Sequence, residues 1–425
     1  MLKRFAVNVA SLFSVQVANF LLPLLTVPYV VRVIGPERLG LLNFSLVYVT
    51  YFSLLINYGF DLAAVRAIAA NRHDRAATSR IVSEVMVGKS LLWVLATLIF
   101  AALTLGNPAF RPYAFLHLCT YLTCIGTVLS PFWIYQAMED LSRVAMANLL
   151  AKLLFTGAVL LLIRQPDDYV WQNLSLSIAQ IVVNGVALRV AVRRFGIRFA
   201  WPTALQLKAR FRADATLFFS NVMITVYASS TVFFLGLLST PLSVGFFSAG
   251  SRLESIARSF VTLALNQALF PIVAGAFGKG TASGLRMVRS VFWPLLGGLA
   301  LVSVGLWVIA PWFVPFFFGA DFTKAVPVLR VVALLPLIIG MSNLLGVHTM
   351  LNLRMDRAFF VITLLGCGLG VSLNLLLINQ YDYVGAAWAW VGTEAGVLAA
   401  MGTYLFISFR NRPPGFPNDS TLYQP

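Results

Sequence analysis

The chain has 425 residues, of which 59% are hydrophobic, and it carries a formal net charge of +16. A single soluble core cannot hide that much apolar surface, because ordinary globular proteins are only about 45 to 50% apolar. The composition therefore excludes an ordinary soluble domain and predicts an all-α protein that crosses a membrane many times.

About twelve apolar stretches are long enough to cross the ~30 Å hydrocarbon core of a bilayer, which takes about 20 helical residues. In chain order, the first six lie near 9–31, 40–60, 81–105, 113–135, 141–163 and 169–192. The second six lie near 213–238, 243–270, 288–318, 325–350, 358–379 and 385–408. They predict an N-lobe at 1–192, a cytoplasmic linker at 193–212, a C-lobe at 213–409 and a cytoplasmic tail at 410–425.

Similar turn residues follow the first span of each lobe, which indicates pseudo-symmetric halves. Pro36 and Gly40 follow the first span, and Pro241 and Gly245 follow the seventh at the same spacing. Transporters built from related halves bind their substrate near the middle of the membrane, between those halves.

Most basic residues of the connections lie on one side of the predicted membrane, as in the segment 193–212. The positive-inside rule assigns that side, and with it both termini, to the cytoplasm. A nucleic-acid surface would need these cations clustered on one folded face, whereas here they are spread over short loops. We therefore expect no nucleic-acid partner.

Four cations remain inside the apolar stretches, accompanied by three acidic residues: Lys89, Lys152, Arg252, Arg258, Glu84, Glu254 and Glu394. A charge at a helix centre costs at least about 2.5 to 3.5 kcal/mol on insertion scales, so these side chains must face one another or a water-filled cavity. For Lys89 the alternative is that its long stem reaches the interface. Lys152 lies too deep for that, at about 1.5 Å of rise per residue.

The spacing of the remaining charges predicts how they pair. Glu254 and Arg258 are four residues apart with the acid first, which favours an ion pair on one helix face. Arg252 has Ser248 and Ile256 at the equivalent positions, so it needs an anion from elsewhere, and its planar guanidinium suits phosphate oxygens. Glu394 is a candidate carrier of a proton or sodium ion; the alternative is a neutral carboxyl bonded to a neighbouring helix.

No catalytic set of nucleophile, base and orienting group is evident, so we expect a transporter rather than an enzyme. We also expect no cofactor beyond a coupling ion.

Several stretches resemble polysaccharide repeat-unit flippases of the O-antigen (Wzx) type. They are NFLLPLLTVPY at 19–29, YGFDL at 58–62, PFWIYQ at 131–136, and the final span from GAA at 385–387 to TE at 393–394. The resemblance implies two six-helix lobes around a V-shaped cleft, as in the multidrug exporters (MATE-like) and lipid II flippases of the same superfamily.

The same resemblance implies the cargo and the location. Such proteins move undecaprenyl-pyrophosphate-linked oligosaccharides from the cytoplasmic to the periplasmic leaflet of the bacterial inner membrane, driven by an ion gradient. The polymerase and ligase of the same pathway are the implied partners.

One residue role is carried over from the lipid II flippases. Residues 247–253, FSAGSRL, resemble a segment of their eighth helix that holds a functional arginine, which corresponds to Arg252. Those relatives also have an Arg-Asp pair on the first helix, where this chain has Thr26 and Val27. The difference favours a glycolipid other than the peptidoglycan precursor.

Together these observations predict a pyrophosphate site and an ion-coupling pair. The expected phosphate ligands are Arg252, Lys152, Arg258 and Lys89, and the expected ion carriers are Glu394 and Glu254. An exporter of cationic drugs would share the fold but would favour an acidic cleft. A membrane glycosyltransferase or ligase would need large loops or convergent carboxylates. The sequence leaves open which sugars the cargo holds and which ion drives it.

Overall fold

The computed structural model describes residues 2–265 and 269–410, and nearly all of this part is helical. It divides into two compact units, Met1–Ala228 and Ser229–Pro425. Nine helical segments within the described part are long and apolar enough to cross a membrane. The helix α1, Leu2–Asn57, and the helix α15, Asp356–Arg410, each contain a break and so hold two predicted spans. The all-α, multi-pass prediction is confirmed, and the helices are compatible with twelve spans.

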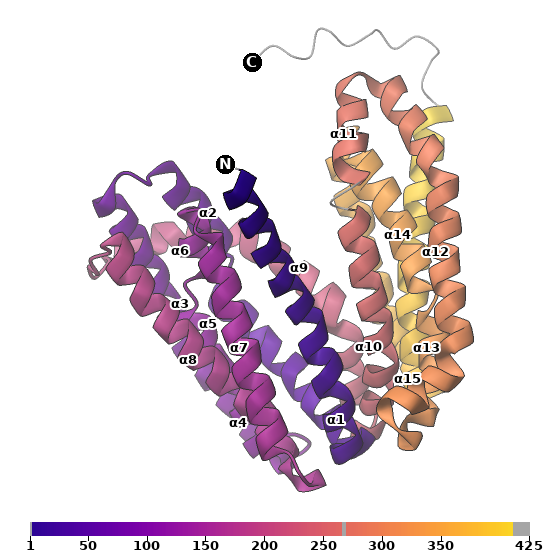
Figure 1. Cartoon of the computed structure of the whole chain (residues 1–425), viewed down its shortest axis with the longest axis horizontal. Coiled ribbons are helices and arrows are strands. Elements are labelled where there is room, and N and C mark those ends of the chain that lie inside the picture. The colour runs from indigo at the N-terminus through magenta and orange to yellow at the C-terminus, as the bar shows by residue number, and fades with distance from the viewer. Residues whose placement is uncertain (1, 266–268, 411–425) are drawn as a thin grey trace. The chain divides into compact units, whose positions relative to one another are not determined.

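The amino-terminal unit contains α1 and the helices that follow it, shown from indigo to magenta in Figure 1. They are α2 Phe60–Ala70, α3 Arg75–Gly106, α4 Ala114–Tyr121, α5 Thr123–Leu129, α6 Phe132–Ala137, α7 Leu141–Leu162, α8 Val170–Phe195 and the first part of α9 Ala204–Leu238. Short 3₁₀ turns at Arg111–Tyr113 and Pro166–Tyr169 precede α4 and α8.

Two glycines break the first helices, one at the predicted turn near residue 35 and one inside the predicted span 40–60. Gly35 has a φ of 77° inside α1, and Gly59 has a φ of 79° between α1 and α2. This left-handed conformation is strained for residues with a side chain. A Cβ atom on Gly59 would also lie 2.9 Å from the Cβ of Leu217 in α9. The second break places Asp61 in the first turn of α2.

The carboxy-terminal unit contains the rest of α9 and the helices α10 Pro241–Ala264, α11 Phe270–Gly278, α12 Thr281–Phe318, α13 Val326–Val332, α14 Leu335–Leu345 and α15. A π-helical turn, Gly346–Met350, follows α14. Helices α10, α13 and α15 pack against one another (Figure 1). The outer faces carry exposed apolar side chains such as Trp293, Leu301 and Phe316, as expected of surfaces that face lipid.

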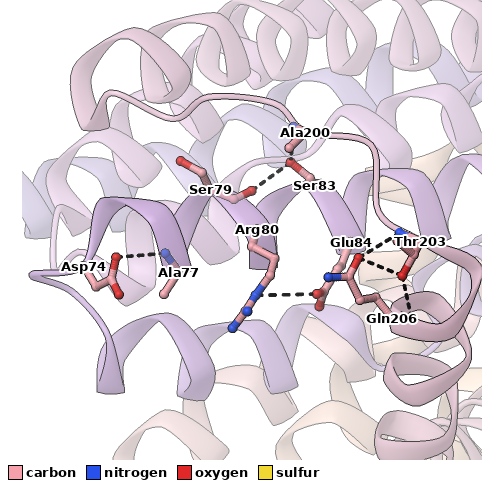
Figure 2. A network of polar contacts seen from close by, with 9 residues as sticks. All are labelled: Asp74, Ala77, Ser79, Arg80, Ser83, Glu84, Ala200, Thr203 and Gln206. Carbon is pink, nitrogen blue, oxygen red and sulfur yellow. Dashed lines mark hydrogen bonds and ion pairs between the residues drawn. The ribbon is translucent and has the colours of Figure 1, made fainter.

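The predicted linker 193–212 is mostly helical, and only residues 197–203 run as extended chain between α8 and α9. This segment is tied to α3, as Figure 2 shows for one of the contacts. The backbone N–H of Arg198 donates to the hydroxyl of Ser79 at 3.0 Å, and that of Ala200 donates to Ser83 at 3.1 Å. The connection is therefore a short strap along α3.

The boundary between the units lies inside α9, after Ala228, rather than in the predicted linker. The physical reason is that the first half of α9 packs on the amino-terminal unit. Phe218 stacks on Tyr58 with ring centroids 4.5 Å apart, and Phe211 contacts Phe60. Of the predicted tail 410–425, all but Arg410 lies outside the described residues.

Candidate functional site

Helix α10 carries the charges that the sequence singled out in the second half of the chain. It begins after Thr240, whose hydroxyl accepts a hydrogen bond from the backbone N–H of Ser243, with Pro241 in its first turn. Its buried face packs on α13 at Gly250, where a Cβ atom would lie 2.7 Å from Val328. This close approach fixes the rotation of α10 about its own axis and hence the direction of its other faces.

Arg252 lies on the face of α10 that turns away from this contact. It is exposed, and no hydrogen bond or ion pair joins it to any residue of the described ranges. Ser248, Ser255 and Ser259 recur at helical spacing on the same face. We call these four residues the Arg252 stripe. A cation flanked by hydroxyls on an apolar helix is suited to bind an anion that also accepts hydrogen bonds.

Glu254 lies on the opposite side of α10 and is completely buried. Its Oε1 accepts a hydrogen bond from Nε of Arg258 at 2.9 Å, which confirms the predicted pair. Arg258 also donates to the hydroxyl of Ser255 at 3.2 Å, so it links the pair to the Arg252 stripe. The guanidinium carbon of Arg258 lies 5.7 Å from the ring centre of Trp390 in α15.

The second predicted ion carrier, Glu394, lies one helical turn from Trp390 on α15 and is buried. It is close enough to Glu254 for the two carboxyl groups to interact electrostatically. The second oxygen of Glu254, Oε2, is buried without a hydrogen-bond partner among the described residues. A buried carboxylate oxygen without a hydrogen-bond partner leaves a place where a proton or cation can bind.

Lys89 and Lys152 lie in the amino-terminal unit. The ammonium of Lys89 is completely buried and lies 2.6 Å from Oδ1 of Asp61, under the ring of Trp133. Because it is enclosed and neutralised, the predicted pyrophosphate role of Lys89 has no geometric support in this structure.

Lys152 lines a cavity of about 340 Å³ within the amino-terminal unit, between α2, α5, α6, α7 and α8. We call it the N-unit cavity. Asp61 lines it too, so the Lys89 pair forms part of its wall. The six predicted residues thus divide into Lys89 and Lys152 in one unit and four residues on α10 and α15 in the other.

Sequence reasoning missed Asp61 because it ended the second span at Phe60. A signal was available, since Asp61 is an acidic residue in a run that stays apolar from residue 40 to residue 65. No group of three or more His, Cys, Asp or Glu side chains that could hold a metal occurs within the described residues.

We expect the substitution Asp61→Asn to destabilise the protein, because it leaves the buried ammonium of Lys89 without a counter-ion. The expected loss is about 1 to 3 kcal/mol of unfolding free energy, below that of a fully buried pair because water reaches Asp61. Thermal unfolding of the purified protein measures it.

The pair Arg38 and Asp167 provides a matched control, since it has the same 2.6 Å separation but lies exposed. Asp167→Asn should leave the unfolding temperature unchanged. The double change of Asp61→Asn with Lys89→Met should recover most of the loss. Equal stability of Asp61→Asn and the unaltered protein would show that the pair is not structural.

The amino-acid sequence of the chain matches a known protein family and a named relative. The family model described as "Polysaccharide biosynthesis protein" matches residues 5–277, more than half of the chain. The chain belongs to this family. A relative in Escherichia coli (strain K12), named "Putative O-antigen transporter", is 26% identical over 396 residues, covering 93% of this chain and 95% of the relative.

Solved structures of the same fold are transporters as well. One is titled "Lipid II flippase MurJ, inward closed conformation" and has a TM-score of 0.74 at 13% identity, covering 94% of this chain and 88% of that one. Another is an inward-facing multidrug resistance MATE family transporter of the MOP superfamily, with a TM-score of 0.66 at 15% identity, covering 92% and 94%. The likeness shows a shared fold, and the chain is a multi-pass membrane protein of this fold.

Proposed function

We propose that the chain is a flippase for undecaprenyl-pyrophosphate-linked oligosaccharide repeat units. It moves them by alternating access from the cytoplasmic to the periplasmic leaflet of the bacterial inner membrane, with both termini in the cytoplasm. Membership of the polysaccharide biosynthesis family and the O-antigen transporter relative support a lipid-linked glycan as cargo. The polymerase and ligase that use the delivered units are its proposed functional partners.

The observation that carries the proposal is the exposed Arg252 on α10, which no hydrogen bond or ion pair joins to the described residues. A pyrophosphate cannot cross hydrocarbon bare, because burying an isolated charge is far too costly. The guanidinium of Arg252 supplies donors for phosphate oxygens, and Arg258 adds a second cation on the same helix. Lys152 serves the same cargo from the amino-terminal unit.

The coupling ion is proposed to bind at Glu254 and Glu394. These two carboxyls lie close together, one of their oxygens lacks a partner, and Arg258 connects them to the phosphate ligands. Binding of a proton or sodium ion would change the charge beside Arg258, and so the affinity of the stripe for an anion.

The alternative function is export of drugs by the same fold. The exposed charge on α10 argues against cationic drugs, because an arginine repels them. A flippase for a different lipid-linked glycan would use the same phosphate ligands and differs only in the sugars recognised.

Complementation tests the proposal. The chain should restore surface polysaccharide to a host that makes the matching lipid-linked repeat unit but lacks its own flippase. If the protein reaches the membrane and the units stay on the cytoplasmic face, the proposed function is wrong.

A further inference from the structure

The N-unit cavity carries several polar groups on a wall that is mostly apolar. Its wall combines the carboxylate of Asp61, the ammonium of Lys152 and the amides of Asn148 and Gln180 with the rings of Phe132 and Phe155. Its volume of about 340 Å³ lies at the lower end of ordinary ligand pockets, which span roughly 300 to 1,000 Å³. The cavity is thus large enough for a small polar ligand.

The two amides on its wall have hydrogen-bonding capacity to spare. Asn148 on α7 and Gln180 on α8 make no hydrogen bond to any other residue within the described part of the chain. Each amide offers two donors and one acceptor oxygen, and polar groups at membrane depth are costly unless they are satisfied. Water or a ligand must therefore complete them.

Asp61 is held in place as an acceptor. Its Oδ1 receives the hydrogen bond from the buried Lys89, yet 35% of its side chain remains exposed. The cavity is reached by solvent, and the carboxylate can accept a further hydrogen bond there. Lys89 acts as a positioning residue. Its ammonium holds the carboxylate of Asp61 in place, but Lys89 does not itself line the cavity.

A carboxylate and an ammonium on one wall do not suit either ion that the proposed function requires, the pyrophosphate or the coupling cation. The carboxylate of Asp61 would repel a phosphate, and the ammonium of Lys152 would repel a metal cation or proton. A pyranose ring fits both, because each of its hydroxyls donates and accepts, and its apolar C–H faces pack on rings such as Phe132 and Phe155.

We propose that the N-unit cavity binds one pyranose residue of the cargo's glycan, through Asn148, Gln180 and Asp61. This inference rests on the proposed function, and it separates sugar recognition in the amino-terminal unit from pyrophosphate recognition at Arg252. The two subsites can then be weakened independently.

Binding of two probes to the full-length protein in lipid nanodiscs tests this separation by titration calorimetry. The first probe is the repeat-unit oligosaccharide released from its lipid by mild acid, and the second is undecaprenyl pyrophosphate without sugar. Asn148→Leu and Gln180→Leu should each weaken binding of the oligosaccharide about tenfold, as the loss of one good hydrogen bond would. Both variants should bind undecaprenyl pyrophosphate as the unaltered protein does.

The control is Gln172→Leu, which makes the same change on α8 outside the cavity wall and should alter neither affinity. If the polar variants fold poorly, Ala151→Phe fills the cavity from α7 without removing a polar group and should also block the oligosaccharide. The sugar subsite alone is overturned if the variants bind the oligosaccharide as the unaltered protein does. It is also overturned if the unaltered protein binds undecaprenyl pyrophosphate but not the oligosaccharide. Failure of the unaltered protein to bind either probe would overturn the proposed function together with it.

Discussion

Replacing Arg252 by alanine should abolish the delivery of surface polysaccharide in a host that depends on this chain. Arg252 is the exposed cation of α10, and no partner within the described residues neutralises it. A hydrogen bond to a charged group contributes roughly 1.5 to 3 kcal/mol, and a guanidinium can form two to one phosphate. The expected loss is therefore on the order of a hundredfold in affinity for the pyrophosphate.

Arg252→Lys should restore part of the activity, since lysine keeps the charge and loses the planar fork. Arg289→Ala is the matched control, because Arg289 is an exposed arginine of the same unit on α12. Surface polysaccharide is measured at equal amounts of protein in the membrane. Full activity of Arg252→Ala would contradict the phosphate role, and equal loss in Arg289→Ala would point to a general effect of charge.

The second large effect is expected at Glu394. Glutamine has nearly the same shape but takes up no proton and ligates a cation weakly. Glu394→Gln should therefore uncouple transport from the ion gradient, and binding of undecaprenyl pyrophosphate should no longer depend on the coupling ion. The change is made at a buried carboxyl beside the unsatisfied oxygen of Glu254, where binding of one positive charge has the largest electrostatic effect.

Transport into vesicles is measured with imposed pH and sodium gradients. The control is Asp321→Asn, which removes an exposed carboxylate of the same unit and should change nothing. If Glu394→Gln keeps the pH and sodium dependence of the unaltered protein, the alternative is correct, and Glu394 is a neutral carboxyl that joins two helices.

Local sequence spacing predicted the parts of the site that lie on one helix. Glu254 and Arg258 pair because four residues of an α-helix bring them to one face, whatever surrounds them. Arg252 does not join this pair for the same reason. It lies two residues before Glu254, and this offset places the two side chains on opposite sides of the helix. The breaks at Gly35 and after Thr240 were likewise readable from short turn sequences.

Features that depend on packing between helices could not be predicted from local sequence spacing. Lys89 pairs with Asp61, which lies 28 residues earlier and beyond the break at Gly59, so only the folded bundle brings them together. The N-unit cavity draws on the five helices α2, α5, α6, α7 and α8, which only the folded bundle brings together. The packing of Phe218 in α9 on Tyr58 likewise joins residues far apart in the sequence.

Vesicles that hold the purified protein and a labelled undecaprenyl-pyrophosphate oligosaccharide test the central claim most directly. The labelled glycan is made in the outer leaflet, and its protection from an added glycosidase is followed over time. The unaltered protein should move the glycan out of the enzyme's reach, and Arg252→Ala should leave it accessible. Equal protection with Arg252→Ala, or no protection by the unaltered protein under any ion gradient, would contradict a flippase that holds its cargo by the pyrophosphate.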